Sequence, residues 1–238
     1  MILDFRAGLN SRSVVYPTSL GRNLCDSSGD SKVWMEGAFY FMNSKSKTRY
    51  IVNVAILSAL AGVLMLIEFP LPIAPTFYKV DLSDVAVLIG GFALKAPAAI
   101  VISFMKVMIS IILNGTSTAF VGEFAAFIMD SVFGFVASLI YQKEHTKKGA
   151  IKSLIFGTLA LTIIGAFVNY YLMIPAYVKF MNIPLDAILS LGSTVNKNVN
   201  SLLTLIIFCT IPFNIIKGII ISIVTYLLYK HISPLLKG

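Results

Sequence analysis

The run of residues 211–228 constrains the fold most, because it is almost wholly apolar and approaches the length of a membrane-spanning helix. Such a helix needs about 20 predominantly apolar residues. Charged residues make up only 13% of the chain and hydrophobic residues 57%, whereas soluble domains carry about 25% charged residues. We therefore expect an all-α integral membrane protein, since helices satisfy their own backbone polar groups in lipid.

Six segments are apolar enough to be membrane helices, although the second is short. They are 50–69, 83–94, 97–113, 120–141, 151–174 and 212–232. Segment 185–209 is harder to place, because its second half, SLLTLIIFCT, is apolar but only long enough for a partial helix. We interpret it as a reentrant or lid-like segment that leads into the sixth helix. A seventh span at this place is the alternative.

Lysine and arginine residues in the short loops predict the orientation of the spans. With six spans, most of these residues lie on one side, before the first span, between the fourth and fifth, and after the sixth. The other side holds only Lys79, Lys179 and Lys197. We therefore expect both termini in the cytoplasm, and seven spans would place the C-terminal lysines outside. The net charge of +8 is then an insertion signal that requires no nucleic acid.

Residues 1–41 differ from the rest of the chain, because they are polar, aperiodic and without the apolar core of a signal peptide. From Met42, a short basic leader followed by a span is typical of the start of a bacterial membrane protein. We expect Met42 to be the native start, residues 1–41 to be a non-native or disordered extension, and residues 42–238 to form the membrane domain.

Two pairs of small residues lie on the first predicted span. Ala55 and Ala59 are four residues apart and share one face of a helix, and so do Ser58 and Gly62. Small residues at this spacing allow another helix to approach closely in a membrane. The pattern alone leaves open whether the approaching helix belongs to this chain or to a partner.

Polar residues within the predicted spans indicate a binding site. A helix rises about 1.5 Å per residue, so Glu123, Asn169, Asn214 and Lys217 come to lie at similar depths in the outer leaflet. Polar residues inside membrane spans are costly and usually functional. Their common depth on different helices predicts a pocket that opens outward.

A structural network is the alternative interpretation of the buried charges. Lys106 in the third span can pair with Glu123 or with Asp130, which lies nearer the midplane, and so hold helices together. Asn214 and Lys217 share one face of the last span and have no acidic residue within that span. We therefore expect Lys106 and Asp130 to be structural, and Asn214 and Lys217 to serve an external ligand.

The residue types of this pocket indicate the kind of ligand. Asparagine offers donors and an acceptor, and lysine offers donors, which suits a neutral heteroaromatic solute with carbonyl groups and ring nitrogens. Aromatic residues such as Tyr78, in the loop after the first span, can flank a flat ring. The sequence contains no P-loop, no metal-ligand spacing and no catalytic motif, so we expect neither ATP hydrolysis nor a metal site.

Four segments resemble the riboflavin-specific S components of energy-coupling factor (ECF) vitamin transporters. They read LSALAGVLMLIEFPLP, YKVDLSDVAVLIGGF, FVNYYLMIPAY and IPFNIIKGIIISIVTYLLYK, and the resemblance extends from residue 50 to the C-terminus. It implies a six-helix, multi-pass subunit of the bacterial plasma membrane. Such a subunit binds riboflavin as its transported ligand, needs no cofactor, and associates with a transmembrane T component and two ABC ATPase subunits.

The resemblance also implies roles for single residues. Ala55 and Ala59 match the face of the family that docks on the T component. Asn169, Asn214 and Lys217 match positions that form hydrogen bonds to the flavin. The loop after the first span covers the ligand in this family, which makes its aromatic residues candidates for contact.

Two other function classes remain open at this point. A stand-alone secondary transporter would use Lys106 and Asp130 to couple transport to a proton, and an intramembrane enzyme would use Glu123 and Asp130 as acids. Transport by the purified chain alone in liposomes would favour the secondary transporter. Vitamin binding without transport would favour the S component.

Overall fold

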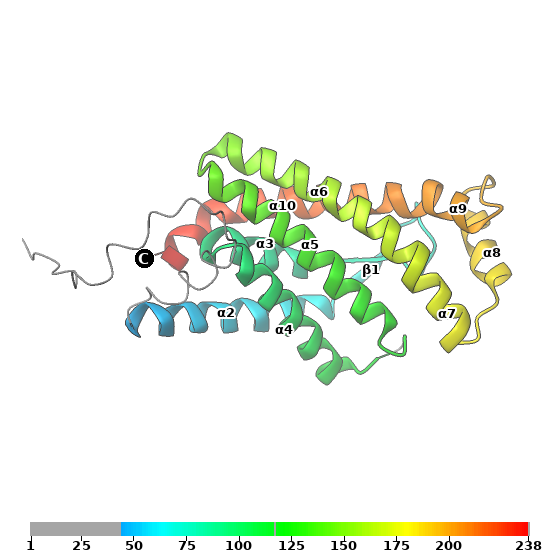
Figure 1. Ribbon diagram of the computed structural model, residues 1–238, viewed down its shortest axis with the longest axis horizontal. Coiled ribbons are helices and arrows are strands. Elements are labelled where there is room, and N and C mark those ends of the chain that lie inside the picture. Colours follow the sequence, from blue (N-terminus) through cyan, green and yellow to red (C-terminus); the bar gives the residue numbers. More distant parts are fainter. Residues whose placement is uncertain (1–43, 117, 238) are drawn as a thin grey trace, which may run out of the picture. The chain divides into compact units, whose positions relative to one another are not determined.

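The computed structural model describes the backbone of residues 44–116 and 118–237, and the side chains of residues 47–116 and 118–229. The predicted extension 1–41 and the predicted start at Met42 lie outside these residues. The described residues form helices and one short two-stranded sheet (Figure 1). The all-α class predicted from the sequence is confirmed.

Five helical runs are long and apolar enough to cross a membrane. Three are single helices: α2 (Ser44–Met65), α4 (Ala96–Asn114) and α5 (Val121–Lys143). The fourth joins α6 (Lys147–Val168), the π-helical segment η1 (Asn169–Met173) and α7 (Ile174–Phe180). The fifth joins α9 (Leu202–Leu205), the π-helical segment η2 (Ile206–Thr210) and α10 (Ile211–Lys237).

Two apolar helices are shorter, α3 (Ser83–Leu94) and α8 (Leu185–Val195). Helix α3 matches the predicted second span in its bounds. Helix α8 is too short to span a bilayer, so the described residues contain no helix for a seventh span. The six-span count and the cytoplasmic ends stay predictions.

The second half of segment 185–209 was predicted as a partial helix within a reentrant or lid-like segment. From Leu202 onward it instead forms the first turns of the last helical run. The fifth predicted span likewise continues past residue 174, to Phe180. Proline lacks an N–H donor and usually ends a helix. Here each proline, Pro175 and Pro212, follows a π-helical turn, and the helix continues through it. Such π-helical turns often mark functional sites.

A β-hairpin follows α2. Its first strand begins at residues that were predicted as the last turn of the first span. Strand β1 (Glu68–Pro70) pairs antiparallel with β2 (Lys79–Asp81), with Phe69 opposite Val80. The three prolines at positions 70, 72 and 75 prevent the helix from continuing. The hairpin therefore brings the loop after α2 back to the start of α3.

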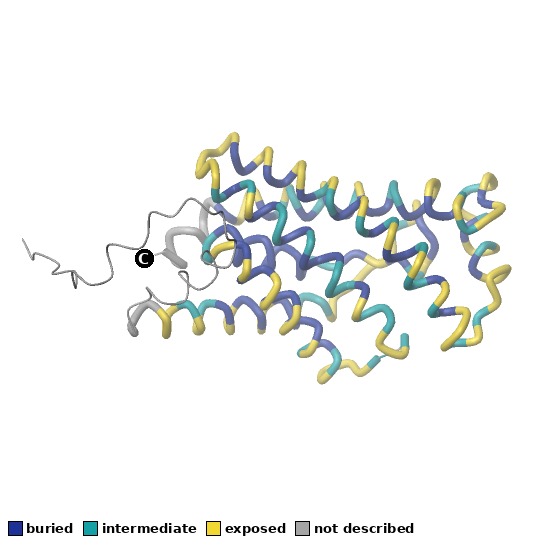
Figure 2. The backbone as a smooth tube through the Cα atoms, viewed as in Figure 1, coloured by how far each residue is buried: buried dark blue, intermediate teal, exposed yellow. Residues whose placement is uncertain are grey.

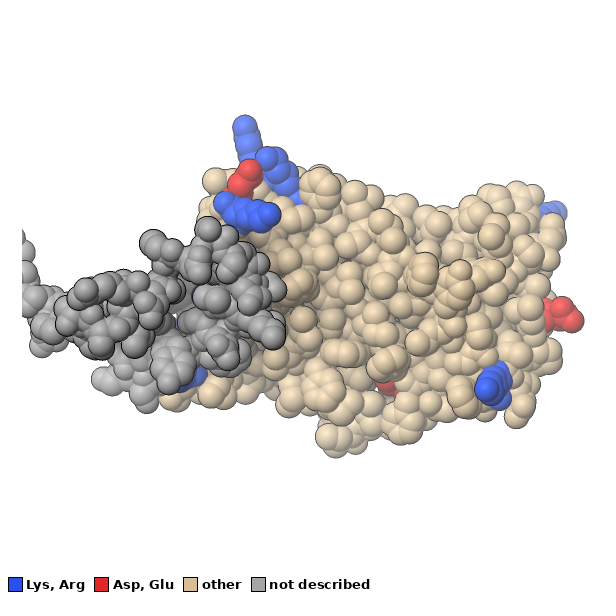
Figure 3. Space-filling model, viewed as in Figure 1, with Lys and Arg blue, Asp and Glu red and all other residues tan. Residues whose placement is uncertain are grey.

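Helix α3 lies at the centre of the described unit. It packs against α2, α4, α5 and α10, and every residue from Ser83 to Phe92 is buried (Figure 2). The outer faces of the longer helices carry exposed apolar side chains, among them Ile112 and Ile163. On the face drawn in Figure 3, charged side chains gather at the two ends and are almost absent between them. This distribution suits a bilayer.

Candidate functional site

A cavity of about 480 Å³ lies between the β-hairpin, α5, η1 and α10. Ligand pockets usually measure about 300–1,000 Å³. All five residues that the sequence nominated for ligand binding line this cavity: Tyr78, Glu123, Asn169, Asn214 and Lys217. Four separate segments of the chain therefore contribute the nominated residues to one site.

Tyr78 connects the loop after α2 with both π-helical segments. Its hydroxyl donates a hydrogen bond to Asn169 Oδ1 over 3.1 Å and lies 2.7 Å from Thr210 Oγ1. Burial raises the pKa of the Tyr78 hydroxyl, which therefore keeps its proton and remains a donor. The Tyr78 ring also packs against Phe77 and Phe213. These rings form an apolar wall beside the polar groups of the cavity.

Asn214 lines the cavity and has an unused acceptor in its side chain. Its side-chain amide nitrogen donates to the Thr210 carbonyl over 3.0 Å, whereas its Oδ1 is buried without a hydrogen-bond partner. The amide nitrogen of Asn169 donates to the Gly165 carbonyl over 2.7 Å. A Cβ atom on Gly165 would lie 2.5 Å from Asn214 Nδ2. The glycine therefore leaves the space in which the Asn214 amide lies.

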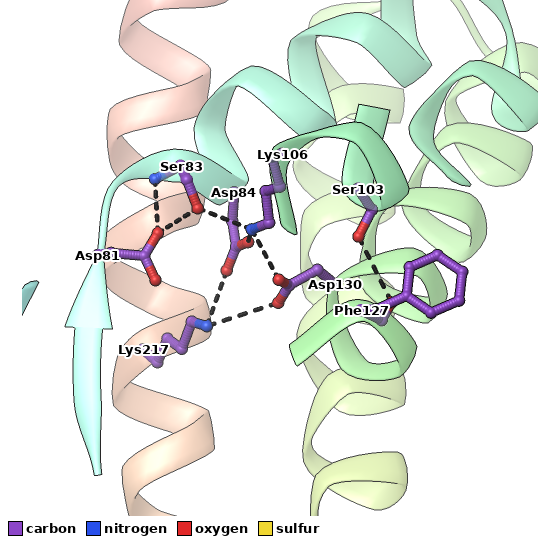
Figure 4. Close-up of polar contacts among 8 residues, drawn as sticks. All are labelled: Asp81, Ser83, Asp84, Ser103, Lys106, Phe127, Asp130 and Lys217. Atoms are coloured by element: carbon purple, nitrogen blue, oxygen red, sulfur yellow. Dashed lines mark hydrogen bonds and ion pairs between the residues drawn. The ribbon is translucent and has the colours of Figure 1, made fainter. Parts of the chain in front are cut away.

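Four buried charged side chains form a closed network beside the cavity (Figure 4). Lys106 Nζ lies 2.5 Å from Asp84 Oδ1 and 2.6 Å from Asp130 Oδ2. Lys217 Nζ lies 2.9 Å from Asp84 Oδ2 and 3.6 Å from Asp130 Oδ1. Lys106 also donates to the Ser83 hydroxyl over 2.7 Å. Each charge thus has two partners of opposite sign, and the two lysines and two aspartates sum to zero.

This network changes the interpretation of two lysines. Lys106 pairs with Asp130, which is one of the two partners that the structural-network interpretation allowed. It does not pair with the other, Glu123. The expectation that Lys217 is free for a ligand was incomplete, because its acidic partners come from α3 and α5 rather than from its own helix. Lys217 both lines the cavity and belongs to the network.

Asp84 is the residue that the sequence reasoning missed. It follows Ser83 in the first turn of α3. The side chain of Asp81, just before this turn, accepts a hydrogen bond from the Ser83 backbone N–H over 2.8 Å. The available signal was an aspartate inside a predicted apolar span, which is as costly there as the lysines are.

Glu123 lies in the first turn of α5 and is partly buried. Its Oε2 accepts a hydrogen bond from the Thr118 hydroxyl over 2.5 Å. A carboxylate is favourable at this end of a helix, because the helix dipole is positive there. Together, the acceptors, donors and rings around the cavity suit the binding of a polar aromatic solute.

The two small-residue pairs of α2 point in different directions. Ser58 is buried, and a Cβ atom on the buried Gly62 would lie 2.8 Å from Ile109 Cβ in α4. Ala55 and Ala59 are exposed on another face of the same helix. The Ser58 pair therefore serves packing within the chain, whereas the alanine pair is accessible to a partner.

Residues 49–229 match the family model described as ECF transporter, substrate-specific component. Riboflavin transporter FmnP of Bacillus subtilis is 33% identical over 79% of this chain and 94% of its own length. Riboflavin transporter RibU of Staphylococcus aureus is 33% identical over 82% of this chain and 99% of its own. A solved S component of a bacterial ECF transporter shares 31% identity, with a TM-score of 0.63, and covers 81% of this chain and 99% of its own.

Proposed function

The chain belongs to the substrate-specific components of ECF transporters, and from this premise we propose that it binds riboflavin and takes part in its uptake. It is a multi-pass membrane protein of the bacterial plasma membrane, and its relatives are transporters rather than enzymes. Riboflavin is the transported ligand, and the chain needs no cofactor. The energy for uptake comes from separate subunits.

The observation that carries this proposal is the convergence of Tyr78, Glu123, Asn169, Asn214 and Lys217 on one cavity. Riboflavin is a flat heteroaromatic ring with carbonyl groups, ring nitrogens and a hydroxylated side chain. We assign Asn169, Asn214 and Lys217 to its polar atoms, because buried amides and an ammonium group offer both kinds of hydrogen-bonding partner. The aromatic wall at Tyr78 and Phe213 suits the face of the ring.

The absorption spectrum of the purified protein tests the proposal. If the chain binds riboflavin tightly, protein purified from cells supplied with the vitamin carries a yellow flavin in near-stoichiometric amount. Protein that is folded and colourless, and that stays colourless after incubation with riboflavin and removal of the excess, would refute the assignment of the ligand.

A stand-alone secondary transporter is the competing function. It would need Lys106 and Asp130 to exchange protons during transport, whereas both belong to a network in which each charge is already paired. We therefore expect the purified chain in liposomes to bind riboflavin without transporting it. Uptake into such liposomes, with a proton gradient and no ATPase subunit, would favour the competing function.

Partner docking is assigned to the exposed face of α2 that carries Ala55 and Ala59. In this family the partners are a transmembrane T component and ATPase subunits, and we propose two ATPase subunits for each complex. Replacing both alanines with leucine fills the surface that a partner helix would approach. We expect riboflavin binding to persist while cellular uptake and recovery of the T component with the chain are both lost.

The control for the docking variant is Ile163→Phe, which adds bulk to an exposed position on α6. This change should leave uptake intact, because it lies on a different helix. Normal uptake by the doubly substituted chain would place the docking surface elsewhere on the molecule.

Gly165→Ala should weaken riboflavin binding, because the added methyl group would displace the Asn214 amide. The expected loss is about tenfold, which corresponds to one hydrogen bond of about 1.4 kcal/mol. Gly157→Ala is a matched control in the same helix, since its methyl group would meet Ala137 and Phe133 rather than a cavity residue. Equal affinities of the two variants, measured by flavin fluorescence quenching, would remove Gly165 from the site.

A further inference from the structure

Carboxylates outnumber ammonium groups around the cavity. Among the described residues, its lining contains four carboxylates and two ammonium groups: Glu68, Asp81, Glu123 and Asp130, and Lys79 and Lys217. A cavity that serves an anionic ligand would show the opposite balance. The distribution of these charges therefore bears on which flavins the cavity accepts.

Both ammonium groups are already paired. Lys79 forms an ion pair with Glu68 at the hairpin, and Lys217 pairs with Asp84 and Asp130. A negatively charged ligand group next to Lys217 would have to compete with two buried aspartates. Breaking such a pair leaves a buried charge without compensation, which is strongly unfavourable.

The negative charge of Glu123 is not balanced by an ion pair in the described part of the chain. Its side chain contacts the neutral hydroxyl of Thr118. Glu123 and Asp130 are seven residues apart on α5 and share one face, which places them about 10 Å apart along the helix. The cavity thus extends from a neutral charge network at one end to an unpaired carboxylate at the other.

These two ends affect neutral and anionic ligands differently. A hydroxyl group of a neutral ligand can donate a hydrogen bond to the Glu123 carboxylate. A phosphate ester carries about −1.5 to −2 charges at pH 7 and offers mainly acceptors. At the network end it meets Lys217, which is already paired with two aspartates, and at the other end it meets the carboxylate of Glu123, which has the same sign of charge.

We propose that Glu123 is a specificity-determining residue that favours uncharged riboflavin over its phosphate ester, flavin mononucleotide. This inference rests on the proposed function, because it concerns the same cavity. Repulsion between like charges at short range near a protein surface changes affinity by about tenfold or more. The effect should shrink as salt is added, since Glu123 is partly exposed.

The test compares the dissociation constants of riboflavin and flavin mononucleotide for the full chain, purified free of ligand, by flavin fluorescence quenching. Glu123→Gln removes the charge and keeps an oxygen that can accept from Thr118. Asp186→Asn is the matched control, because it removes one charge from an exposed position on α8 that does not line the cavity. We expect the dissociation constant of flavin mononucleotide divided by that of riboflavin to fall about tenfold in Glu123→Gln. This ratio should stay unchanged in the Asp186→Asn control.

Two outcomes would overturn the inference while leaving riboflavin binding intact. One is equal affinity of the unaltered protein for both flavins, and the other is an unchanged ratio in a folded Glu123→Gln protein. If the variant does not fold, the ratio is measured for the unaltered protein between low and high salt, where a constant value would also count against Glu123. Failure of the folded, unaltered protein to bind riboflavin would instead refute the proposed function.

Discussion

Replacing Lys106 with methionine should lower the free energy of unfolding by about 3–5 kcal/mol, which is the usual cost of removing one partner from a buried ion pair. Lys106 is fully buried and holds Asp84 and Asp130 at 2.5 and 2.6 Å. Without it, two buried carboxylates share a single lysine. Thermal unfolding of the ligand-free protein in detergent measures the effect.

Two further variants make this prediction specific. Lys152→Met breaks a half-exposed pair with Glu144 and should change stability by no more than about 1 kcal/mol. Asp130→Asn, combined with Lys106→Met, removes one carboxylate charge and should restore much of the lost stability. A Lys106→Met protein as stable as the unaltered one would show that the network does not hold the helices together.

Replacing Lys217 with methionine should impair both folding and riboflavin binding. The sequence of the last helix alone predicts that this variant folds normally, because no acid lies in that helix; the ion pair with Asp84 reverses the expectation. A hydrogen bond to a charged group contributes about 1.5–3 kcal/mol, so its loss should weaken riboflavin binding about 10- to 100-fold. Stability and affinity are measured on the same preparation.

The double variant Lys217→Met with Asp84→Asn separates the two roles of Lys217. It removes one cation and one anion, so the network stays neutral and stability should recover. The affinity for riboflavin should stay low, because the ligand has still lost its donor. Full affinity in a stable double variant would mean that Lys217 serves only the network.

The lengths of the apolar runs predicted the helices well, because they depend directly on the lipid that surrounds a membrane helix. The short helix α3 was predicted with the bounds that it has, although burial by four other helices, not lipid, accounts for its composition. The bounds near Pro175 and Pro212 were wrong, since a π-helical turn before a proline leaves no mark in a hydropathy pattern.

Contacts between helices were less accessible from the sequence. Depth along each span placed Asn169 and Lys217 at one level, and the structure brings both to one cavity. The pairing of Lys217 with Asp84 depends on how α3 and α10 face each other, which no single helix encodes. For the same reason, the sequence could not tell that Ala55 faces outward while Ser58 packs inside.

Titration of the ligand-free, purified chain with riboflavin tests the central claim most directly. The claim is that the cavity between the hairpin, α5, η1 and α10 is a riboflavin site within this chain alone. We predict saturable quenching of flavin fluorescence with one riboflavin per chain and no requirement for a partner subunit. Protein shown to be folded by cooperative thermal unfolding, yet giving no saturable quenching, would contradict the claim.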